Sequence, residues 1–556
     1  MKRIFYLGLL FYSSSAFSQI KDSTSTISKV KDIVESIHGN FQVDAQYYNK
    51  DTTIGAPIVP QKVLSNGFGN VNYIRGNFSA GIRYESYNPV MQGFDPRYQG
   101  AGIPYRYARY KVANLDITAG NFYDQFGSGM IFRVYEDRGL LYDNTMDGFR
   151  AIYNPIRGIT IKGMIGHQRT FFTTSPGIVR AGDMDVNLNE LFNPSGTMKT
   201  KITLGGSFVS KYQSNASTTL NLPANVGCYG GRLSLNNGGF NFYSEYAYKI
   251  NDPSLTNNYS FKSGQGLLAT ASYAASGFSF MWAGKYTDNM SFRSDRDQTL
   301  NAAMINYMPS LTKYQTYLMA TYYPYATQPN GEIATQGEIQ YKAKRGSVLG
   351  GKYGMEIALN GSMAFGTDTT NLAPQNDARQ YHYTVNPYKL GQQYFHDFNI
   401  EINKKFSKKV KTTFLYCNQF YNKNIIIENS SSNEFANIKT NVFVTDWTFK
   451  YKPASSIRME AQWMQTKQDK GSWAEAMIEW WPKSNFYLAV VDQYNYGNPE
   501  KSKQIHYYLA NIGFIRDGTR ITMSYGKQRA GVFCVGGVCR TVPASDGLSM
   551  TIMQSF

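Results

Sequence analysis

The sequence predicts an all-β protein, a transmembrane antiparallel β-barrel that closes on itself. Three observations predict it. No apolar run after the first residues approaches the ~18 residues of a membrane helix, apolar and polar residues alternate with period two along most of the chain, and short turns alternate with longer connections. Aromatic residues make up 15% of the chain, with 44 Tyr and 34 Phe, as girdles at the two membrane surfaces would require.

The start of the chain predicts export. Two basic residues and an apolar run ending in small residues are typical of a secretory signal peptide, with the cut before Gln19. The sequence therefore divides into a signal peptide at 1–18, a leader at 19–39 and a barrel at 40–556. The leader predicts a short amphipathic helix on the periplasmic side, and a leader without fixed structure is the alternative. The leader's apolar residues at helical spacing are Ile27, Val30, Val34 and Ile37.

The last residues predict how the barrel closes. Read as a strand, the final segment places apolar residues on one face and small polar residues on the other, as expected of a strand with lipid outside and water inside. We therefore expect this strand to pair with the first one. The apolar set is Leu548, Met550, Ile552 and Phe556, and the polar set is Ser549, Thr551 and Ser555.

The turns predict the number of strands. Connections rich in Gly, Asn, Asp and Pro recur, and between them lie longer connections, the longest near Met363 to Leu390. Counting them predicts about 26 strands, with 24 as the alternative, and an even number returns both termini to the periplasm. The predicted short turns are 75–77, 114–116, 154–158, 193–196, 236–239, 276–277, 309–312, 345–347, 407–408, 453–456, 482–485 and 517–518.

A barrel of this width would leave an uncontrolled hole unless loops or a partner fill it. The connection from Phe126 to Gly148, between the fifth and sixth predicted strands, combines glycines with charges of both signs. By architectural analogy with the inward loop of porins, it predicts a constriction inside the lumen. An extracellular loop whose charges pair locally is the alternative. The candidate constriction residues are Arg133, Glu136, Asp137, Arg138 and Asp143.

The charge balance bears on what the barrel contacts. The formal net charge is +17, which suits anionic solutes in the lumen or phosphates of surface lipid, and basic residues ringing both rims are the alternative. Lys162, Lys201 and Arg458 occupy the polar face of their predicted strands and are candidates for the lumen wall. We expect outer-membrane lipid and lipopolysaccharide as partners, other envelope proteins as a further alternative, and no nucleic acid.

Four cysteines occur in the chain. Cys534 and Cys539 flank a Val-Gly-Gly-Val turn, which predicts a hairpin disulfide in an oxidising compartment, with small buried residues as the alternative. Cys228 and Cys417 lie within strand patterns and are expected to stay single.

No pattern predicts an enzyme, a metal site or a cofactor. The alternating Asp183, Asp185, Asn187 and Asn189 suggest a calcium loop, but Leu188 stands where that loop needs Gly, so a strand with a polar lumen face explains them better. The five histidines are scattered, and no nucleophile elbow, phosphate loop or dinucleotide fingerprint is present.

One stretch carries a resemblance. The run from Gly120 to Gly127, followed by Tyr135 to Arg138 and by Asp147-Gly148, resembles a Bacteroidota family of large outer-membrane proteins of unknown function. The resemblance implies an envelope location over nearly the whole chain and no established activity. Some large barrels of that phylum are subunits of secretion or assembly machines, so it also implies a partner role as an option.

Two functions follow as hypotheses. The first is a porin-like outer-membrane channel for polar or anionic solutes in a Gram-negative bacterium, narrowed by inward loops. The second is an occluded structural subunit of a larger secretion, assembly or uptake complex. The residues do not choose between them.

Overall fold

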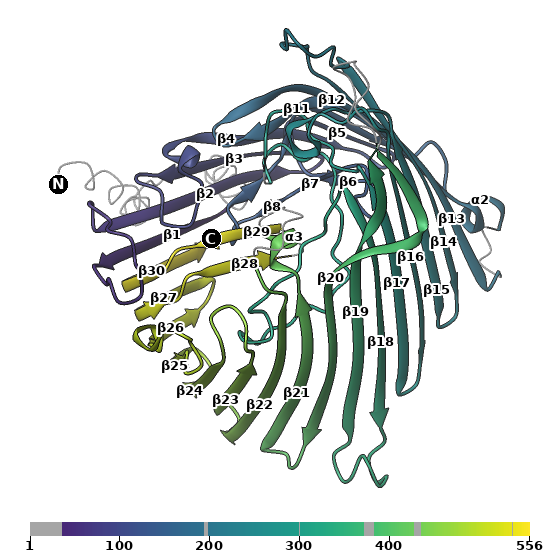
Figure 1. Ribbon diagram of the computed structural model, residues 1–556. Helices are drawn as coiled ribbons and strands as arrows, with labels where there is room; N and C mark the ends of the chain where they lie inside the picture. The colour runs from purple at the N-terminus through teal and green to yellow at the C-terminus, as the bar shows by residue number, and fades with distance from the viewer. Residues whose placement is uncertain (1–35, 194–197, 300, 372–382, 428–434, 536–537) are drawn as a thin grey trace, which may run out of the picture.

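The computed structural model describes residues 36–193, 198–299, 301–371, 383–427, 435–535 and 538–556. Within these ranges the chain forms a closed antiparallel barrel of 24 strands (Figure 1). In order around the ring, the strands are β1 (Ile37–Asn49), β2 (Val63–Arg75), β3 (Phe78–Tyr87), β4 (Gly100–Lys111), β5 (Leu115–Phe122), β10 (Met146–Tyr153), β11 (Ile159–Thr170), β12 (Thr173–Asn187), β13 (Thr200–Tyr212), β14 (Asn225–Asn237), β15 (Phe240–Lys249), β16 (Gly264–Ala275), β17 (Phe278–Asp288), β18 (Gly331–Ala343), β19 (Met355–Asn371), β20 (Tyr383–Lys405), β21 (Val410–Tyr421), β22 (Ile438–Lys452), β23 (Ser455–Gln465), β24 (Trp473–Lys483), β25 (Phe486–Tyr494), β26 (His506–Arg516), β27 (Thr519–Gln528) and β30 (Ser545–Ser555).

Small elements occupy the connections. None of the helices in the described ranges has the length and apolar character needed to span a bilayer. The small elements are β6 (Asp124–Gln125), β7 (Arg133–Val134), β8 (Glu136–Asp137), β9 (Tyr142–Asp143), β28 (Gly531–Val535), β29 (Val538–Val542), η2 (Pro96–Tyr98), η3 (Leu255–Asn257), η4 (Lys501–Lys503), α2 (Leu188–Phe192) and α3 (Lys423–Ile426).

The last strand closes the ring on the first, as predicted. β30 pairs antiparallel with β1, with Ile552 opposite Val43, and it pairs with β27 on its other side. Backbone bonds of 2.9 Å in both directions join Gly39 to Phe556 at the rim. On the inner face, the hydroxyl of Thr551 donates to the Asp44 carboxylate at 2.7 Å. A closed ring leaves no strand edge unpaired, which a barrel in lipid requires.

The predicted alternation is confirmed. On β13, Leu204 and Phe208 are 44% and 40% exposed, whereas Val209 is fully buried. Large apolar side chains that no protein group covers recur from strand to strand, and a surface of this kind needs a lipid environment. Examples are Val43, Val71, Ile82, Phe149, Ile165, Met184, Leu204, Tyr229, Leu267, Ile339, Leu359, Phe414, Phe443, Ile478, Val490, Ile512 and Leu548.

The predicted count of about 26 strands is wrong, and the alternative of 24 holds in the described ranges. The error lies at the predicted turn 309–312. β17 pairs directly with β18, with Trp282 opposite Gly337, so the residues between these strands contribute no strand to the wall. They run through the lumen instead, where buried side chains give the same apolar signal as lipid-facing ones.

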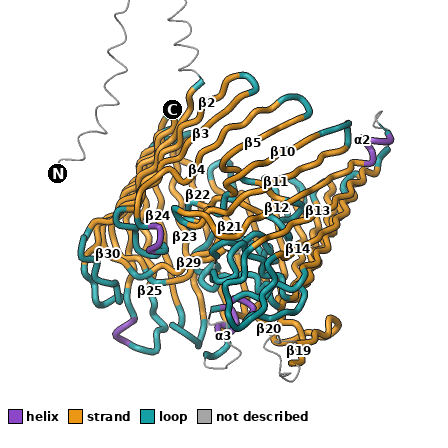
Figure 2. The backbone as a smooth tube through the Cα atoms, turned by 90° about the horizontal axis from the view of Figure 1, so that it is seen from above, coloured by secondary structure: helices purple, strands orange, loops and turns teal. Residues whose placement is uncertain are grey.

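Two predicted boundaries also move. The barrel begins at Ile37 rather than at residue 40, so the end of the predicted leader is strand. The rest of the leader helix and the signal peptide lie outside the described residues. In the predicted long connection from Met363 to Leu390, the described residues 363–371 and 383–390 are strand, because β19 and β20 extend beyond the wall (Figure 2).

Two long connections turn into the barrel rather than away from it. β5 and β10 have only eight residues each, so the wall is low where the chain leaves Phe122 and returns at Met146. The second connection leaves β17 and returns at β18. In Figure 2 the loops gather inside the barrel, away from the end where the short turns and the C-terminus lie. We call that end the short-turn mouth and the other the long-loop mouth.

Closure predicts a sensitive position at Gly39. A Cβ at Gly39 would overlap the Phe556 ring and approach the Asn70 carbonyl oxygen to 2.6 Å, whereas a Cβ at Gly69 meets nothing within 4 Å. Gly39→Val should therefore lower the temperature at which the barrel loses its heat-modifiable mobility on gels, with an overpacking cost of ~1–3 kcal/mol. Gly69→Val is the matched control. Equal midpoints for the two variants would contradict the closure geometry.

Candidate functional site: the plugged lumen

Two segments fill the lumen, and together we call them the plug. The inner loop comprises residues 123–145, and the lumen strap comprises residues 289–299 and 301–330. They are joined as neighbouring strands would be: the Arg133 amide donates to the Ile305 carbonyl at 2.8 Å, and the Tyr307 amide donates to the Gly129 carbonyl at 2.9 Å. The plug is therefore one unit made from two connections.

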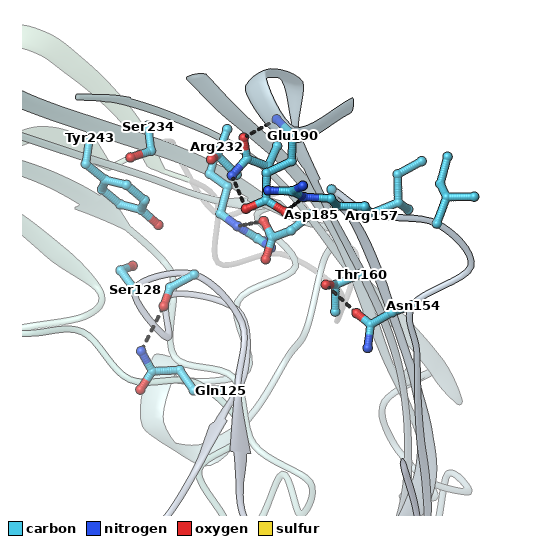
Figure 3. A pocket seen from close by; sticks show the side chains of 16 residues that line it. Gln125, Ser128, Asn154, Arg157, Thr160, Asp185, Glu190, Arg232, Ser234 and Tyr243 are labelled. Atoms are coloured by element: carbon cyan, nitrogen blue, oxygen red, sulfur yellow. Dashed lines mark hydrogen bonds and ion pairs between the residues drawn. The ribbon is translucent and has the colours of Figure 1, made fainter. Parts of the chain in front are cut away.

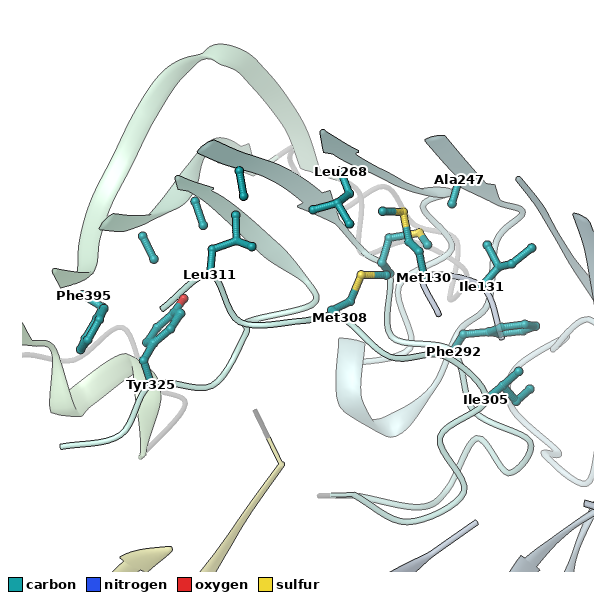
Figure 4. Packing of buried hydrophobic residues seen from close by; sticks show 14 of the residues in the cluster. Met130, Ile131, Ala247, Leu268, Phe292, Ile305, Met308, Leu311, Tyr325 and Phe395 are labelled. Atoms are coloured by element: carbon teal, nitrogen blue, oxygen red, sulfur yellow. The ribbon is translucent and has the colours of Figure 1, made fainter. Parts of the chain in front are cut away.

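The plug has an apolar core of its own. Met130, Ile131, Phe292 and Ile305 are all fully buried. Figure 4 shows that they come from both segments, with wall residues above them such as Leu268. Each such side chain contributes roughly 1.5–3 kcal/mol when removed from water. A dry core inside the ring favours a plug that stays in place without a partner.

The lumen strap crosses the barrel from one side to the other. At one end the Ser294 carbonyl lies so close to Gly177 of β12 that a Cβ there would overlap it. At the other end the Tyr322 ring lies 5.3 Å from the Trp473 ring of β24. β12 and β24 are diametrically opposed, because twelve strand pairings separate them in either direction around the described sheet.

Polar wall residues hold the strap by its backbone. Gln462 of β23 accepts from the Met319 amide at 2.8 Å, and Gln419 of β21 donates to the Ala320 carbonyl at 2.9 Å. Near the middle, Lys313 of the strap lies 3.4 Å from both Glu338 and Glu401 of the wall. Buried backbone groups need such partners, so the inner wall substitutes for water.

A buried charge cluster anchors the inner loop to the wall. Arg169 of β11 lies 2.6 Å from Glu85 of β3 and 2.7 Å from Asp143 of the loop. Arg83 of β3 pairs with Asp143 as well, and with Glu136 at 2.9 Å. The Arg83, Glu85 and Arg169 side chains are at most 3% exposed. Buried charges are tolerated only when paired in this way, and losing one partner is costly.

The predicted constriction residues all lie on the inner loop, inside the barrel. Glu136 and Asp143 belong to the charge cluster. Arg138 pairs with Glu136 at 2.9 Å, Asp137 accepts from the Leu140 amide at 3.1 Å, and Arg133 stacks between two tyrosine rings. In this state the charged groups hold the loop in place. Their role as a selectivity filter stays a prediction.

Tyrosines complete the cluster on the loop side. The Tyr123 hydroxyl donates to Asp143 at 3.1 Å. Burial raises the pKa of the Tyr123 phenol, and the Asp143 charge raises it further. Burial likewise raises the pKa of Tyr142. Both phenols therefore stay protonated, and Tyr123 remains a donor to the carboxylate.

The predicted wall residues occupy the inner faces of their strands. Lys162 of β11 lies 2.7 Å from Asp124 of the inner loop. Arg458 of β23 lies 3.0 Å from Asp446. Lys201 shares the inner parity of β13 and is exposed near the short-turn mouth. The structure does not bring these three together, and their contact with a solute stays a prediction.

A cavity of about 790 Å³ opens between the inner loop and the short-turn mouth (Figure 3). Its walls are the loop residues Gln125, Gly127 and Ser128, the turn after β10, and strands β11 to β15. Arg232 binds Asp183 at 2.8 Å and Asp185 at 2.6 Å. Asp183 and Asp185 of the calcium-like sequence pattern are thus partners of a guanidinium.

Two of the four cysteines are single, as expected. Cys228 and Cys417 are free and buried, and both belong to the same cluster as the plug side chains. Cys534 and Cys539 are opposite each other in the register of β28 and β29, but their side chains lie outside the described part of the structure. The hairpin disulfide stays a prediction.

Sequence reasoning missed the wall side of the charge cluster. Arg83 and Glu85 share the inner face of β3, and a signal was present: two opposite charges at period two on a face expected to meet water. Nothing in the sequence pointed to Arg169 as their common partner. The lumen strap was missed as well, because its turn signal resembled those of the wall.

Comparison with protein families gives a single result. The model described as "Family of unknown function (DUF6029)" matches residues 1–556. The chain belongs to the DUF6029 family. The family result agrees with the expected lack of an assigned activity and says nothing of lineage. A comparison with curated proteins gives no match.

Several solved structures give distant matches. The siderophore receptor PirA from Pseudomonas aeruginosa is 8% identical, with a TM-score of 0.41, over 94% of this chain and 80% of its own. OccK5 (OpdH) from the same organism is 11% identical, with a TM-score of 0.35, over 78% and 98%. The transporter YddB from Escherichia coli is 8% identical, with a TM-score of 0.38, over 93% and 81%. Similarities this distant assign no function.

The charge cluster predicts unequal effects of two arginine substitutions. Arg169→Met leaves Glu85 and Asp143 short of a buried partner and should destabilise the barrel by ~3–5 kcal/mol. Arg516→Met removes an exposed pair with Asp517 of 3.0 Å at the turn after β26 and should cost at most ~1 kcal/mol. Urea unfolding in micelles, followed by tryptophan fluorescence, measures both. The double variant Arg169→Met/Glu85→Met should recover part of the loss, and equal single-variant effects would contradict the cluster.

Proposed function

We propose that this DUF6029 protein is a gated outer-membrane channel for polar solutes, closed at rest by its plug. The observation that carries the proposal is the lumen strap, which spans opposite walls and is held there by side chains of the wall. The short-turn mouth would face the periplasm, as is usual for bacterial barrels, and the long-loop mouth the exterior. Lipopolysaccharide would then surround the long-loop end.

Cavities on both sides of the plug support a path for solutes through the barrel. A cavity of about 400 Å³ lies at the long-loop side, between the loop after β3, the inner loop and the strap. Cavities of about 790 and 660 Å³ lie toward the short-turn mouth. Vestibules on both sides of a barrier are the arrangement that a gated channel needs.

The second candidate is an occluded structural subunit of an envelope complex. The observation that favours it is the dry core of the plug, because fully buried side chains such as Met130 and Phe292 resist displacement. We rank it second because the strap is also held through neutral amides and tyrosine hydroxyls, which exchange with water at low cost.

The two candidates differ in conductance. Gln419→Ala/Gln462→Ala removes the two wall amides that hold the strap backbone, at ~1 kcal/mol each, and should raise the open probability by about tenfold or more. Planar-bilayer recording at low salt measures this. The wild-type barrel should show rare openings.

The matched control is Gln46→Ala/Gln336→Ala, which removes two inner-wall amides bonded to other wall residues and should leave the conductance unchanged. A second route to the same result is Gly177→Val, which pushes the strap at its other end. Silence of the wild type and of both strap variants would refute the channel and leave the structural subunit.

A further inference from the structure

We propose that the short-turn mouth contains a binding site for multiply charged phosphate compounds. The site is the cavity of about 660 Å³ enclosed by the turns after β16, β18 and β20 and by the ends of the flanking strands. This volume is within the ~300–1,000 Å³ of typical small-molecule sites. The proposal names a solute class for the proposed channel and rests on that function only for transport, since binding can be measured separately.

Nine of the ten charged residues that line this cavity are basic. Its one carboxylate, Glu356, is already paired with Lys342 at 2.5 Å. Lys404 donates to two turn carbonyls at 2.9 Å. The other basic side chains of the lining have no ion-pair partner among the described residues: Lys344, Arg345, Lys405, Lys408, Lys409, Lys411 and Lys450.

Part of this charge faces the lumen rather than lipid. Asn403 and Thr413 bond to each other on the inner face of β20 and β21, and Glu401 on the same face reaches Lys313 of the strap. Lys405 and Lys411 follow at the same parity, two residues nearer the mouth. A solute that enters from the short-turn mouth would meet these amines before it reaches the strap.

The arrangement is unfavourable for the barrel alone. Lys405 and Lys411 are direct partners in the register of β20 and β21, and like charges directly opposite one another destabilise a sheet. Lys450 of β22 lies on the same inner face, where Thr448 is the partner of Lys411. A bound polyanion would remove this repulsion, so the cluster is better explained by a ligand than by stability.

The chemistry selects phosphate. Lysine amines act as compact point charges with several donors, and they bind phosphate oxygens well. At least three amines converge on one hollow, so a ligand with two or more negative charges gains most. Because the inward lysines turn away from lipid, we assign the site to a soluble phosphate compound rather than to a lipid headgroup.

The test is binding of pyrophosphate to the full-length protein. Isothermal titration in zwitterionic micelles at low salt should show saturable binding, weakened by added potassium chloride as screening predicts. Lys405→Gln/Lys411→Gln/Lys450→Gln should weaken it by about tenfold or more, because it removes the charge-assisted bonds. Equal affinity of this variant and the wild type would overturn the proposal.

The control removes the same charge elsewhere. Lys62→Gln/Lys111→Gln/Lys483→Gln changes three lysines that lie outside the cavity lining, so its affinity should stay within about twofold of the wild type. If this control weakens binding as much as the test variant, only net charge matters and the site is refuted. Failure of the channel test would leave this comparison intact.

Nanodiscs separate the two sources of phosphate. Pyrophosphate should bind equally well in phosphatidylcholine discs and in discs that contain phosphatidylglycerol. If phosphatidylglycerol abolishes pyrophosphate binding and co-purifies with the wild type but not with the triple variant, the site holds a lipid headgroup and our assignment is wrong.

Discussion

A closed ring of membrane strands has no free edge, but it encloses a space that must be filled. That constraint organises this protein. Pairing β30 with β1 satisfies every strand edge in the described wall and fixes the width of the lumen. The chain then needs material inside the ring, and it takes this material from two of its own connections. The inner loop and the lumen strap follow from the closure of the barrel.

Two kinds of interaction stabilise the plug inside the lumen. Apolar side chains of both plug segments bury one another at the centre, as Met130 and Ile305 do. At the margins, amides and charges of the wall replace the water that the plug backbone would otherwise bind, as Gln462 and Arg169 do. The inner face of a strand in this protein is therefore polar for structural reasons, and its lysines differ in whether the plug supplies a partner. Lys162 has a plug partner, whereas Lys405 and Lys411 face each other without one among the described residues.

The sequence predicts the strands of the barrel wall but not how the segments inside the lumen contact it. Alternation and turn chemistry are local properties, so the closing strand could be predicted from them. The inward course of the connection from Phe126 to Gly148 was predicted from its glycines and mixed charges by analogy with porins, with an extracellular loop as the alternative. The strand count failed at 309–312 because a buried strap and a lipid-facing strand have the same apolar signal, and only pairing distinguishes them. The charge cluster could not be predicted, because Arg83, Glu85, Asp143 and Arg169 come from segments that meet only in the folded ring. Long-range partners of this kind leave no period in the sequence.

The central claim is that the plug packs against the inner wall and keeps water from it, and two native thiols report on this directly. Cys228 and Cys417 are buried beneath the plug. In a Cys534→Ser/Cys539→Ser background, a hydrophilic maleimide should leave both thiols unmodified in native micelles and label both after denaturation. A cysteine placed at Thr160, which lines the open cavity between the inner loop and the short-turn mouth, should react in the native state. Rapid labelling of Cys228 and Cys417 in the native barrel would contradict the plugged lumen.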